Sequence, residues 1–378
     1  MSRFTFTSES VSEGHPDKVC DYISDSILDA CLEQDAASRV ACETLCKSDT
    51  VVLAGEITTN ATLDYDKIVR RAVKEIGYTD PSEPFCDTTL KVISLITRQS
   101  NEISQGVTAT TSQSGDQGAG DQGIMFGYAS DESEEMMPLP ILLAHRLTKG
   151  MADDRKAGRY GWLRPDSKSQ VSLSYDGNDA REVTAVVIST QHSPDADQKR
   201  ITEYVREDLG PRTLGKWWHR DLTLYVNPTG SFVHGGPSAD AGVTGRKIIV
   251  DSYGGWGRHG GGAFSGKDPS KVDRSSAYFC RYVAKQVVGA GLARKAEIQV
   301  GYAIGMAKPV SVKVETFGTG DERAAAAFVM DSFDFRPRAI IDKLNLLRPI
   351  YRSTTNYGHF GRTGLPWEAV EKPAAVAR

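Results

Sequence analysis

The chain has 378 residues, 25% of them charged, and a formal net charge of −4. At about 100–200 residues per domain, this length predicts two or three domains. The near-neutral charge disfavours non-specific nucleic-acid binding, which depends on clustered lysine and arginine. Six cysteines form no C-x-x-C pair, so neither a zinc site nor a disulfide framework is indicated. The N-terminal segment lacks the apolar core of a signal peptide, and no apolar run reaches the roughly 18 residues of a membrane span. We therefore expect a reduced, soluble, cytoplasmic protein with neither nucleic acid nor membrane as partner.

An order of helix, two strands and helix is predicted three times along the chain. The first unit comprises a helix over 17–34, strands over 40–46 and 51–58, and a helix over 64–76 that Gly77 ends. The second comprises a helix over 139–155, strands over 170–175 and 183–191, and a helix over 196–208. The third comprises a helix over 274–289, strands over 297–304 and 310–317, and a helix over 322–333. Three related α+β layers follow, each a sheet covered on one face by helices.

Residues 100–120 are rich in Ser, Thr, Gln and Gly and contain few apolar side chains. A loop this long inside a compact domain is usually functional or disordered. Two interpretations stay open for it, a lid over a site and a passive linker.

A glycine-rich stretch, GGGAFSGKDPSKVDRS, runs from Gly260 to Ser275. Its residues 261–267 satisfy G-x-x-x-x-G-K, but Asp268 follows, where a P-loop has the Ser or Thr that binds Mg²⁺. The stretch offers glycines, two lysines and two carboxylates. It favours chemistry with a phosphate chain and disfavours an ordinary P-loop ATPase.

A second glycine-rich stretch, GAGDQGIMFGYA, runs from Gly118 to Ala129 and contains the dinucleotide pattern G-x-G-x-x-G. The context fails, because no buried strand precedes it and no acid follows about 20 residues later. A glycine turn that leads into a strand over 123–129 is the plainer interpretation. The pair Asp121–Gln122 remains a possible ligand contact.

The segment GHPDK, from Gly14 to Lys18, begins the first predicted helix. Pro16 suits the first helical turn, and Asp17 there complements the helix dipole. A functional interpretation is equally open. Helix N-termini bind anions, so His15 and the free amides would face an anion while Asp17 holds a divalent cation.

Two glutamates, Glu43 and Glu56, lie inside otherwise apolar strands. By strand alternation Glu43 shares a face with Ala41 and Leu45. A carboxylate on a buried face is costly without a cation or hydrogen-bond donors, so a metal ion or a substrate ammonium is expected there. The alternative is that both side chains face water.

Basic side chains lie beside glycine- and proline-rich turns rather than along helix faces. We expect them to gather around a di- or triphosphate, although each taken singly is also a plausible surface charge. They are Lys168, Arg246, Lys247, Lys267 and Lys271.

Taken together, these segments resemble the S-adenosylmethionine synthetase family. The resemblance rests on GHPDK, GEITT, GAGDQGIMFGYA, WLRPDSKSQV, GPSADAGVTGRKIIVD and HGGGAFSGKDPSKVDRS, which occur in order from about residue 6 to residue 367. It implies three βαββ-type domains about a pseudo-threefold axis, assembled from non-contiguous segments. The implied boundaries are 1–12 with 130–234 (N-terminal domain), 13–101 with 235–274 (central domain) and 102–129 with 275–378 (C-terminal domain). It also implies a homodimer with active sites between subunits, usually paired into a homotetramer.

The resemblance further implies that methionine sulfur attacks C5′ of ATP and displaces triphosphate, which is then hydrolysed to pyrophosphate and phosphate. Two Mg²⁺ and one K⁺ serve as cofactors. Catalytic roles fall to His15, Lys168, Arg246 and Lys267. ATP contacts fall to those four residues and to Asp166, Ser231, Phe232, Asp240, Lys247 and Ala263. Methionine contacts fall to Glu56, Gln99, Asp240 and Lys271. Asp17 and, less centrally, Asp273 correspond to Mg²⁺ ligands, and Glu43 corresponds to a K⁺ ligand.

One position departs from the family pattern. Gly230–Ser231–Phe232 stands where the family commonly has Gly-Arg-Phe, so a contact that needs the arginine side chain is lost. A phosphotransferase that passes the γ-phosphoryl group to a small acceptor is the alternative enzyme. A catalytically inactive regulatory subunit is a third interpretation, against which the presence of His15, Asp17 and Lys267 argues.

Overall fold

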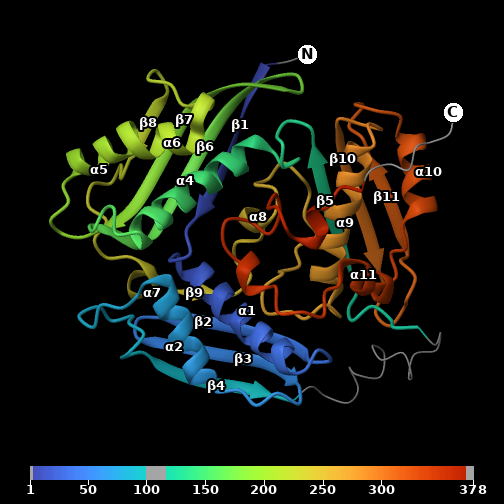
Figure 1. Ribbon diagram of the computed structural model, residues 1–378, viewed down its shortest axis with the longest axis horizontal. Helices are drawn as coiled ribbons and strands as arrows, with labels where there is room; N and C mark the ends of the chain where they lie inside the picture. The colour runs from blue at the N-terminus through green and yellow to red at the C-terminus, as the bar shows by residue number, and fades with distance from the viewer. Residues whose placement is uncertain (1–2, 99–115, 372–378) are drawn as a thin grey trace.

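The computed structural model of the chain describes residues 3–98 and 116–371, and these form three β-sheets with helices packed against them (Figure 1). The strand orders are β1-β6-β7-β8, β4-β3-β2-β9 and β11-β10-β5. The prediction of an α+β fold with three layers is confirmed. Each sheet combines strands that are distant in sequence, which the linear pattern of elements did not reveal.

The first sheet contains β1 (Arg3–Val11), β6 (Leu163–Asp176), β7 (Asp179–His192) and β8 (Thr223–Val226). Helix α4 (Leu139–Lys156) packs on its inner face, where β6 buries alternate apolar side chains. The sequence predicted one helix over 196–208. The structure instead has α5 (Gln198–Tyr204), a π-helical turn (Val205–Leu209) and α6 (Gly210–Leu214).

The second sheet contains β2 (Arg39–Lys47), β3 (Thr50–Thr58), β4 (Lys91–Thr97) and the short β9 (Gly242–Val243). Helices α1 (Pro16–Gln34) and α2 (Tyr65–Ile76) cover one face (Figure 1). Helix α2 ends as predicted at Gly77, whose left-handed φ of 110° suits glycine. The pairing of β9 with β2 brings residues 242–243 beside a strand almost 200 positions earlier.

The third sheet contains β5 (Gly123–Ser130), β10 (Lys295–Tyr302) and β11 (Ser311–Glu315). Helix α9 (Val272–Gly289) packs against it, and α10 (Glu322–Ser332) and α11 (Pro337–Leu344) complete the layer. Two short helices, α7 (Gly236–Ala239) and α8 (Ile248–Asp251), lie in the connection between β8 and α9. Short 3₁₀ turns occupy Gly215–Trp217, Arg352–Thr354 and Pro366–Glu368.

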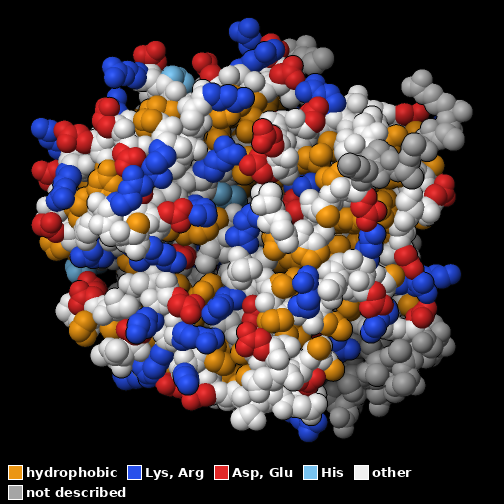
Figure 2. Space-filling view, viewed as in Figure 1, with side chains coloured by type: hydrophobic (Ala, Val, Ile, Leu, Met, Phe, Trp, Pro, Cys, Tyr) orange, Lys and Arg blue, Asp and Glu red, His pale blue; other side chains and the backbone are white. Residues whose placement is uncertain are grey.

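Charges of both signs are interspersed on the face that Figure 2 shows, in keeping with the small net charge. None of the helices in the described ranges is both long and apolar enough to cross a membrane.

Helix α9 lies so close to β5 that a glycine is required between them. A Cβ atom added at Gly127 would come within 2.0 Å of the Cys280 carbonyl carbon. The Cys280 carbonyl carbon is helix backbone, so it cannot move aside by a change of rotamer as a side chain could.

We expect Gly127→Ala to destabilise the protein by about 1–3 kcal/mol, the usual cost of overpacking a well-filled core. Gly161→Ala is the matched control, since nothing lies within 4 Å of its added Cβ. Thermal unfolding of the two variants measures the difference. Equal melting temperatures would contradict the close packing of α9 on β5.

Candidate active site

Three segments meet at the N-terminus of α1. A Cβ atom added at Gly14 would lie 2.3 Å from the Pro165 carbonyl, so the GHPDK segment touches the WLRPDSK segment. A Cβ atom added at Gly242 would lie 2.1 Å from the carbonyl oxygen of Pro16. Side chains would prevent both approaches, which gives these glycines a physical role.

The two glycine-rich stretches also lie against each other. A Cβ atom added at Gly260 would come within 1.6 Å of the Ile124 carbonyl oxygen. At Gly120 the nearest atom would be the Ser270 carbonyl oxygen, at 3.0 Å. The two glycine-rich stretches are about 140 residues apart in the sequence, and the tertiary structure brings them into contact.

His15 is the N-cap residue of α1, and its Nδ1 accepts a hydrogen bond from the Asp17 amide at 3.2 Å. Burial and then the positive charge of Lys247 lower the pKa of the imidazole to about 3. His15 is therefore neutral at physiological pH. Because Nδ1 accepts, the ring carries its proton on Nε2 and is a hydrogen-bond donor there.

Asp17 faces the basic loop that follows β9. Its carboxylate accepts from the Val243 amide at 3.0 Å and pairs with Lys247 Nζ at 2.6 Å. Burial works to raise the pKa of Asp17, but these two hydrogen bonds and the lysine charge outweigh it and lower that pKa. An ionised carboxylate at a helix N-terminus is a suitable partner for a divalent cation.

A second lysine–carboxylate pair lies on the glycine-rich stretch. Lys267 Nζ lies 2.5 Å from Asp273 Oδ2, and a Cβ atom added at Gly262 would lie 2.3 Å from the other oxygen of that carboxylate. We call the loop with Arg246 and Lys247 and the loop with Lys267 the two basic loops. They touch, since a Cβ atom added at Gly245 would lie 2.5 Å from the Cβ atom of Ala263. Lys247 and Lys267 thus belong to neighbouring loops, and that they gather around a phosphate chain stays a prediction.

The other carboxylate of this stretch, Asp268, turns inward. It is fully buried, accepts from the Val40 amide at 2.8 Å and pairs with Lys271 Nζ at 2.5 Å. Burial would raise the pKa of Asp268, but the charges of Lys271 and Arg39 outweigh it and lower that pKa. The residue that replaces the P-loop hydroxyl therefore ties the loop to β2.

Asp166 presents a buried oxygen that lacks a partner. Its Oδ2 accepts from the Gly236 amide at 2.9 Å, whereas Oδ1 has no hydrogen bond among the described residues. Burial raises the pKa of this carboxyl to about 6, against the hydrogen bond from Gly236 and the charge of Lys168. An unpartnered buried oxygen is an acceptor for a ligand donor.

The loop that carries Ser231 and Phe232 is fixed by His192, whose Nε2 accepts from the Phe232 amide at 3.0 Å. Ser231 itself is exposed and Phe232 is half-buried. The remaining candidates on these loops, Lys168, Asp240 and Arg246, are exposed and face solvent in the chain taken singly.

Of the two placements considered for Glu43 and Glu56, the single chain shows the water-facing one, and the expected buried face is wrong. Both are exposed, because they lie on the face of β2 and β3 that α1 and α2 do not cover. Strand register places them in adjacent rows, Glu43 opposite Ala54 and Glu56 opposite Ala41. The buried face instead carries Val40, Cys42, Cys46, Val51, Leu53 and Ile57.

Gln99 lies outside the described residues, as does most of the 100–120 loop. Sequence reasoning also missed a set of buried groups that hold the site loops, namely Asp21, Asp25 and Arg274. A signal was available, because aspartate recurs at every fourth position of the first predicted helix from Asp17 to Asp29.

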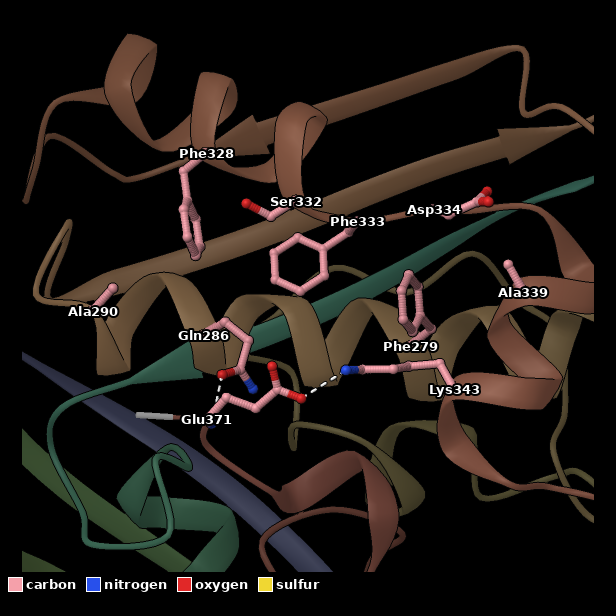
Figure 3. A pocket seen from close by; sticks show the side chains of 10 residues that line it. All are labelled: Phe279, Gln286, Ala290, Phe328, Ser332, Phe333, Asp334, Ala339, Lys343 and Glu371. Atoms are coloured by element: carbon pink, nitrogen blue, oxygen red, sulfur yellow. Dashed lines mark hydrogen bonds and ion pairs between the residues drawn. The ribbon is translucent and has the colours of Figure 1, made fainter. Parts of the chain in front are cut away.

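A cavity of about 370 Å³ opens elsewhere, between α9, α10 and α11 (Figure 3). Three phenylalanines line it, and an ion pair of 2.6 Å between Lys343 and Glu371 lies at one side. None of the predicted site residues lines this cavity.

Comparison with known proteins assigns the class. Family models for S-adenosylmethionine synthetase match along the chain: the N-terminal domain over residues 3–101, the central domain over 116–232 and the C-terminal domain over 234–369. The S-adenosylmethionine synthase of Sorangium cellulosum is 55% identical over 380 residues, which cover 100% of this chain and 90% of that protein. The S-adenosylmethionine synthase of Akkermansia muciniphila is 54% identical over 384 residues, covering 98% and 97%.

The chain belongs to the S-adenosylmethionine synthetase family. It is accordingly a transferase of S-adenosylmethionine biosynthesis, a methionine adenosyltransferase. The resemblance drawn from the sequence motifs is confirmed.

The neutral state of His15 has a measurable consequence. In the unfolded chain the imidazole titrates near 6.5, whereas in the folded chain its pKa is about 3. Folding therefore loses stability as pH falls below about 6.5, because only the unfolded chain takes up the proton.

Between pH 6 and pH 5 we expect the unfolding free energy of the wild type to fall by about 1 kcal/mol more than that of His15→Asn. Denaturant titrations of both proteins at the two pH values measure this difference. Identical pH slopes would show that His15 is not held neutral.

Proposed function

We propose that the chain joins L-methionine to the adenosyl group of ATP by attack of the sulfur on C5′. The displaced triphosphate is then hydrolysed to pyrophosphate and phosphate. The observation that carries this proposal is the contact between two basic loops, each with a lysine beside a carboxylate: Lys247 with Asp17, and Lys267 with Asp273. Such an array suits a polyphosphate leaving group and its metal ions.

The reaction needs no general base, because a thioether sulfur is already a nucleophile. The protein must instead align sulfur, C5′ and the leaving oxygen, which contributes up to about 7–11 kcal/mol to lowering the barrier. It must also stabilise the charge that develops on the leaving triphosphate. We assign that role to Arg246, Lys247, Lys267 and Lys168, with His15 donating from Nε2.

Asp17 and Asp273 are the residues that we propose to hold two Mg²⁺ ions. The described residues contain no cluster of three or more His, Cys, Asp or Glu placed to hold a metal by themselves. The carboxylates nevertheless fit Mg²⁺, which usually takes one or two protein carboxylates together with substrate phosphates. When bound, such ions would neutralise charge on the phosphate oxygens.

ATP and methionine are assigned to the remaining candidates as the family resemblance implies. The unpartnered Oδ1 of Asp166 supports a contact to ATP there. Ser231, Phe232, Asp240 and Ala263 complete the proposed ATP set. For methionine we propose Glu56, Gln99, Asp240 and Lys271. Lys271 already forms an ion pair with Asp268, so part of its charge is neutralised before methionine binds.

A homodimer would complete the site at the open face of the second sheet. Three apolar side chains are exposed there, Leu45, Ile93 and Leu95, at 44%, 46% and 60%. Strand register puts Leu45 in one row with Ile93, and Glu43 in the next row with Leu95. A second copy on this face would bury the apolar rows and enclose Glu43, our proposed K⁺ ligand. Pairing of dimers into a tetramer and a cytoplasmic location remain proposals from the resemblance.

We also propose that the three domains are assembled from non-contiguous segments. The three sheets support non-contiguous domains, since β1 pairs with β6, and β9 pairs with β2. We retain the boundaries 1–12 with 130–234, 13–101 with 235–274, and 102–129 with 275–378.

One product assay tests the reaction. Incubation with ATP, methionine, Mg²⁺ and K⁺ is expected to yield S-adenosylmethionine, pyrophosphate and phosphate by mass spectrometry. ADP with a phosphorylated acceptor would instead indicate the alternative phosphotransferase. Folded protein that forms neither set of products would defeat the proposal.

We expect Lys267→Ala and Arg246→Ala each to lower kcat by about 100-fold or more, the usual cost of removing one preorganised charge-stabilising donor. ATP affinity should fall less than kcat, since these cations act mainly on charge that develops in the transition state. Steady-state kinetics with a separate measurement of ATP binding checks the comparison. Turnover near wild type in both variants would refute the assignment.

We expect Leu95→Lys to dissociate the dimer, because it puts a charge in the apolar rows, and to lower synthetase activity with it. Met330→Lys on α10 is the matched control, since Met330 is also 60% exposed. Analytical ultracentrifugation and activity at equal concentrations measure both effects. A dimeric, fully active Leu95→Lys variant would remove this face from the interface.

A further inference from the structure

Four aspartates follow one stripe of α1 at intervals of four residues: Asp17, Asp21, Asp25 and Asp29. Residues spaced by four lie on the same side of a helix. All four are buried, with exposed fractions of 4%, 0%, 0% and 8%. Buried carboxylates are costly unless donors meet them, so the contacts of this stripe require an explanation.

Each carboxylate accepts backbone amides from a distant loop. Asp17 accepts from Val243, Asp21 from Gly245 at 2.8 Å, and Asp25 from Gly266 at 2.8 Å. Gly245 and Gly266 belong to the two basic loops of the site, and Val243 ends strand β9, which leads into the first of them. Asp29 accepts from Tyr351 and Arg352, at 3.0 and 2.9 Å, outside those loops.

Asp25 and its partner Arg274 together hold the backbone on the two sides of the Gly266–Lys267 peptide. Arg274 makes two hydrogen bonds of 2.7 Å to the Asp25 carboxylate. The same guanidinium donates to the Lys267 carbonyl oxygen at 3.2 Å. Asp25 thus fixes the Ser265–Gly266 peptide through its N–H, and Arg274 fixes the Lys267–Asp268 peptide through its carbonyl oxygen.

Asp21 acts in the same way on the loop before Arg246 and Lys247. Its charge is balanced by Lys18, whose Nζ lies 3.0 Å from Asp21 and 2.5 Å from Asp251. Gly245, which donates to Asp21, has a left-handed φ of 78° and packs on Ala263 of the other loop. The stripe therefore sets the position of both basic loops relative to one rigid helix.

We propose that Asp21 and Asp25 are positioning residues for the adenosyl-transfer reaction, which set the spacing of Arg246 and Lys247 relative to Lys267. The inference rests on the proposed function. Neither carboxylate needs to touch substrate, because each acts through the backbone of a loop. A misplacement of about 1 Å can lower turnover by about 100-fold even when it arises outside the reacting groups.

Asp29 supplies the matched control. It lies on the same stripe, is buried and accepts two backbone amides, but it fastens residues 351–352 rather than a basic loop. A purely structural role of the stripe predicts equal effects at all three positions. A positioning role predicts loss of turnover at Asp21 and Asp25 only.

The test compares Asp21→Asn, Asp25→Asn and Asp29→Asn in the full chain by thermal unfolding, kcat, and KM for ATP. Asparagine keeps the shape and one acceptor oxygen. We expect kcat to fall by about 10- to 100-fold in the first two variants, with a much smaller rise in KM. Asp29→Asn should lower the melting temperature but keep kcat within about two-fold of the wild type.

Wild-type kcat in folded Asp21→Asn and Asp25→Asn would overturn the inference, as would an equal loss of kcat in Asp29→Asn. If Asp25→Asn does not fold, the kcat of Asp21→Asn decides the inference. That variant is expected to fold, because Lys18 keeps its ion pair with Asp251. Absence of S-adenosylmethionine from the wild type itself would defeat the proposed function and the inference together. An active wild type with unaffected variants defeats the inference alone.

Discussion

Carboxylates that are removed from water must be met by donors, and helix α1 places four of them in the interior. Backbone amides of two basic loops, together with Lys18 and Arg274, supply most of those donors. Burial of these carboxylates and placement of the basic loops therefore depend on each other. A loop that moved away would remove an amide donor from a buried carboxylate, which costs about 1–3 kcal/mol.

The close contacts at glycine complement these charges. Gly242 lets β9 approach the first turn of α1, and Gly260 lets the stretch 260–275 lie on β5, the strand into which the stretch 118–129 leads. The carboxylates of α1 hold the loops through hydrogen bonds, and the glycines, which have no side chain, let the loop backbone approach closely. Asp268, which stands where a P-loop has a hydroxyl, acts in the same way, because its carboxylate accepts a hydrogen bond from β2 and so holds the loop there.

Much of this organisation could be predicted from the sequence. Three repeated units, the end of α2 at Gly77 and the basic residues beside glycine turns all followed from local pattern, because periodicity and turn chemistry act over a few residues. The strands β1, β4, β8 and β9 were not predicted. Glu43 and Glu56 were assigned to a buried face, because alternation separates the two faces of a strand but does not say which one the helices cover.

The sequence by itself determined the family, the α+β class and the identity of the basic and acidic residues, since these depend on residue type and local spacing. Only the tertiary structure decided which of them meet. Asp25 and Arg274 are 249 positions apart, and the pairing of Asp21 with Gly245 spans 224. Contacts over such separations depend on how distant loops pack against α1, which no local pattern records.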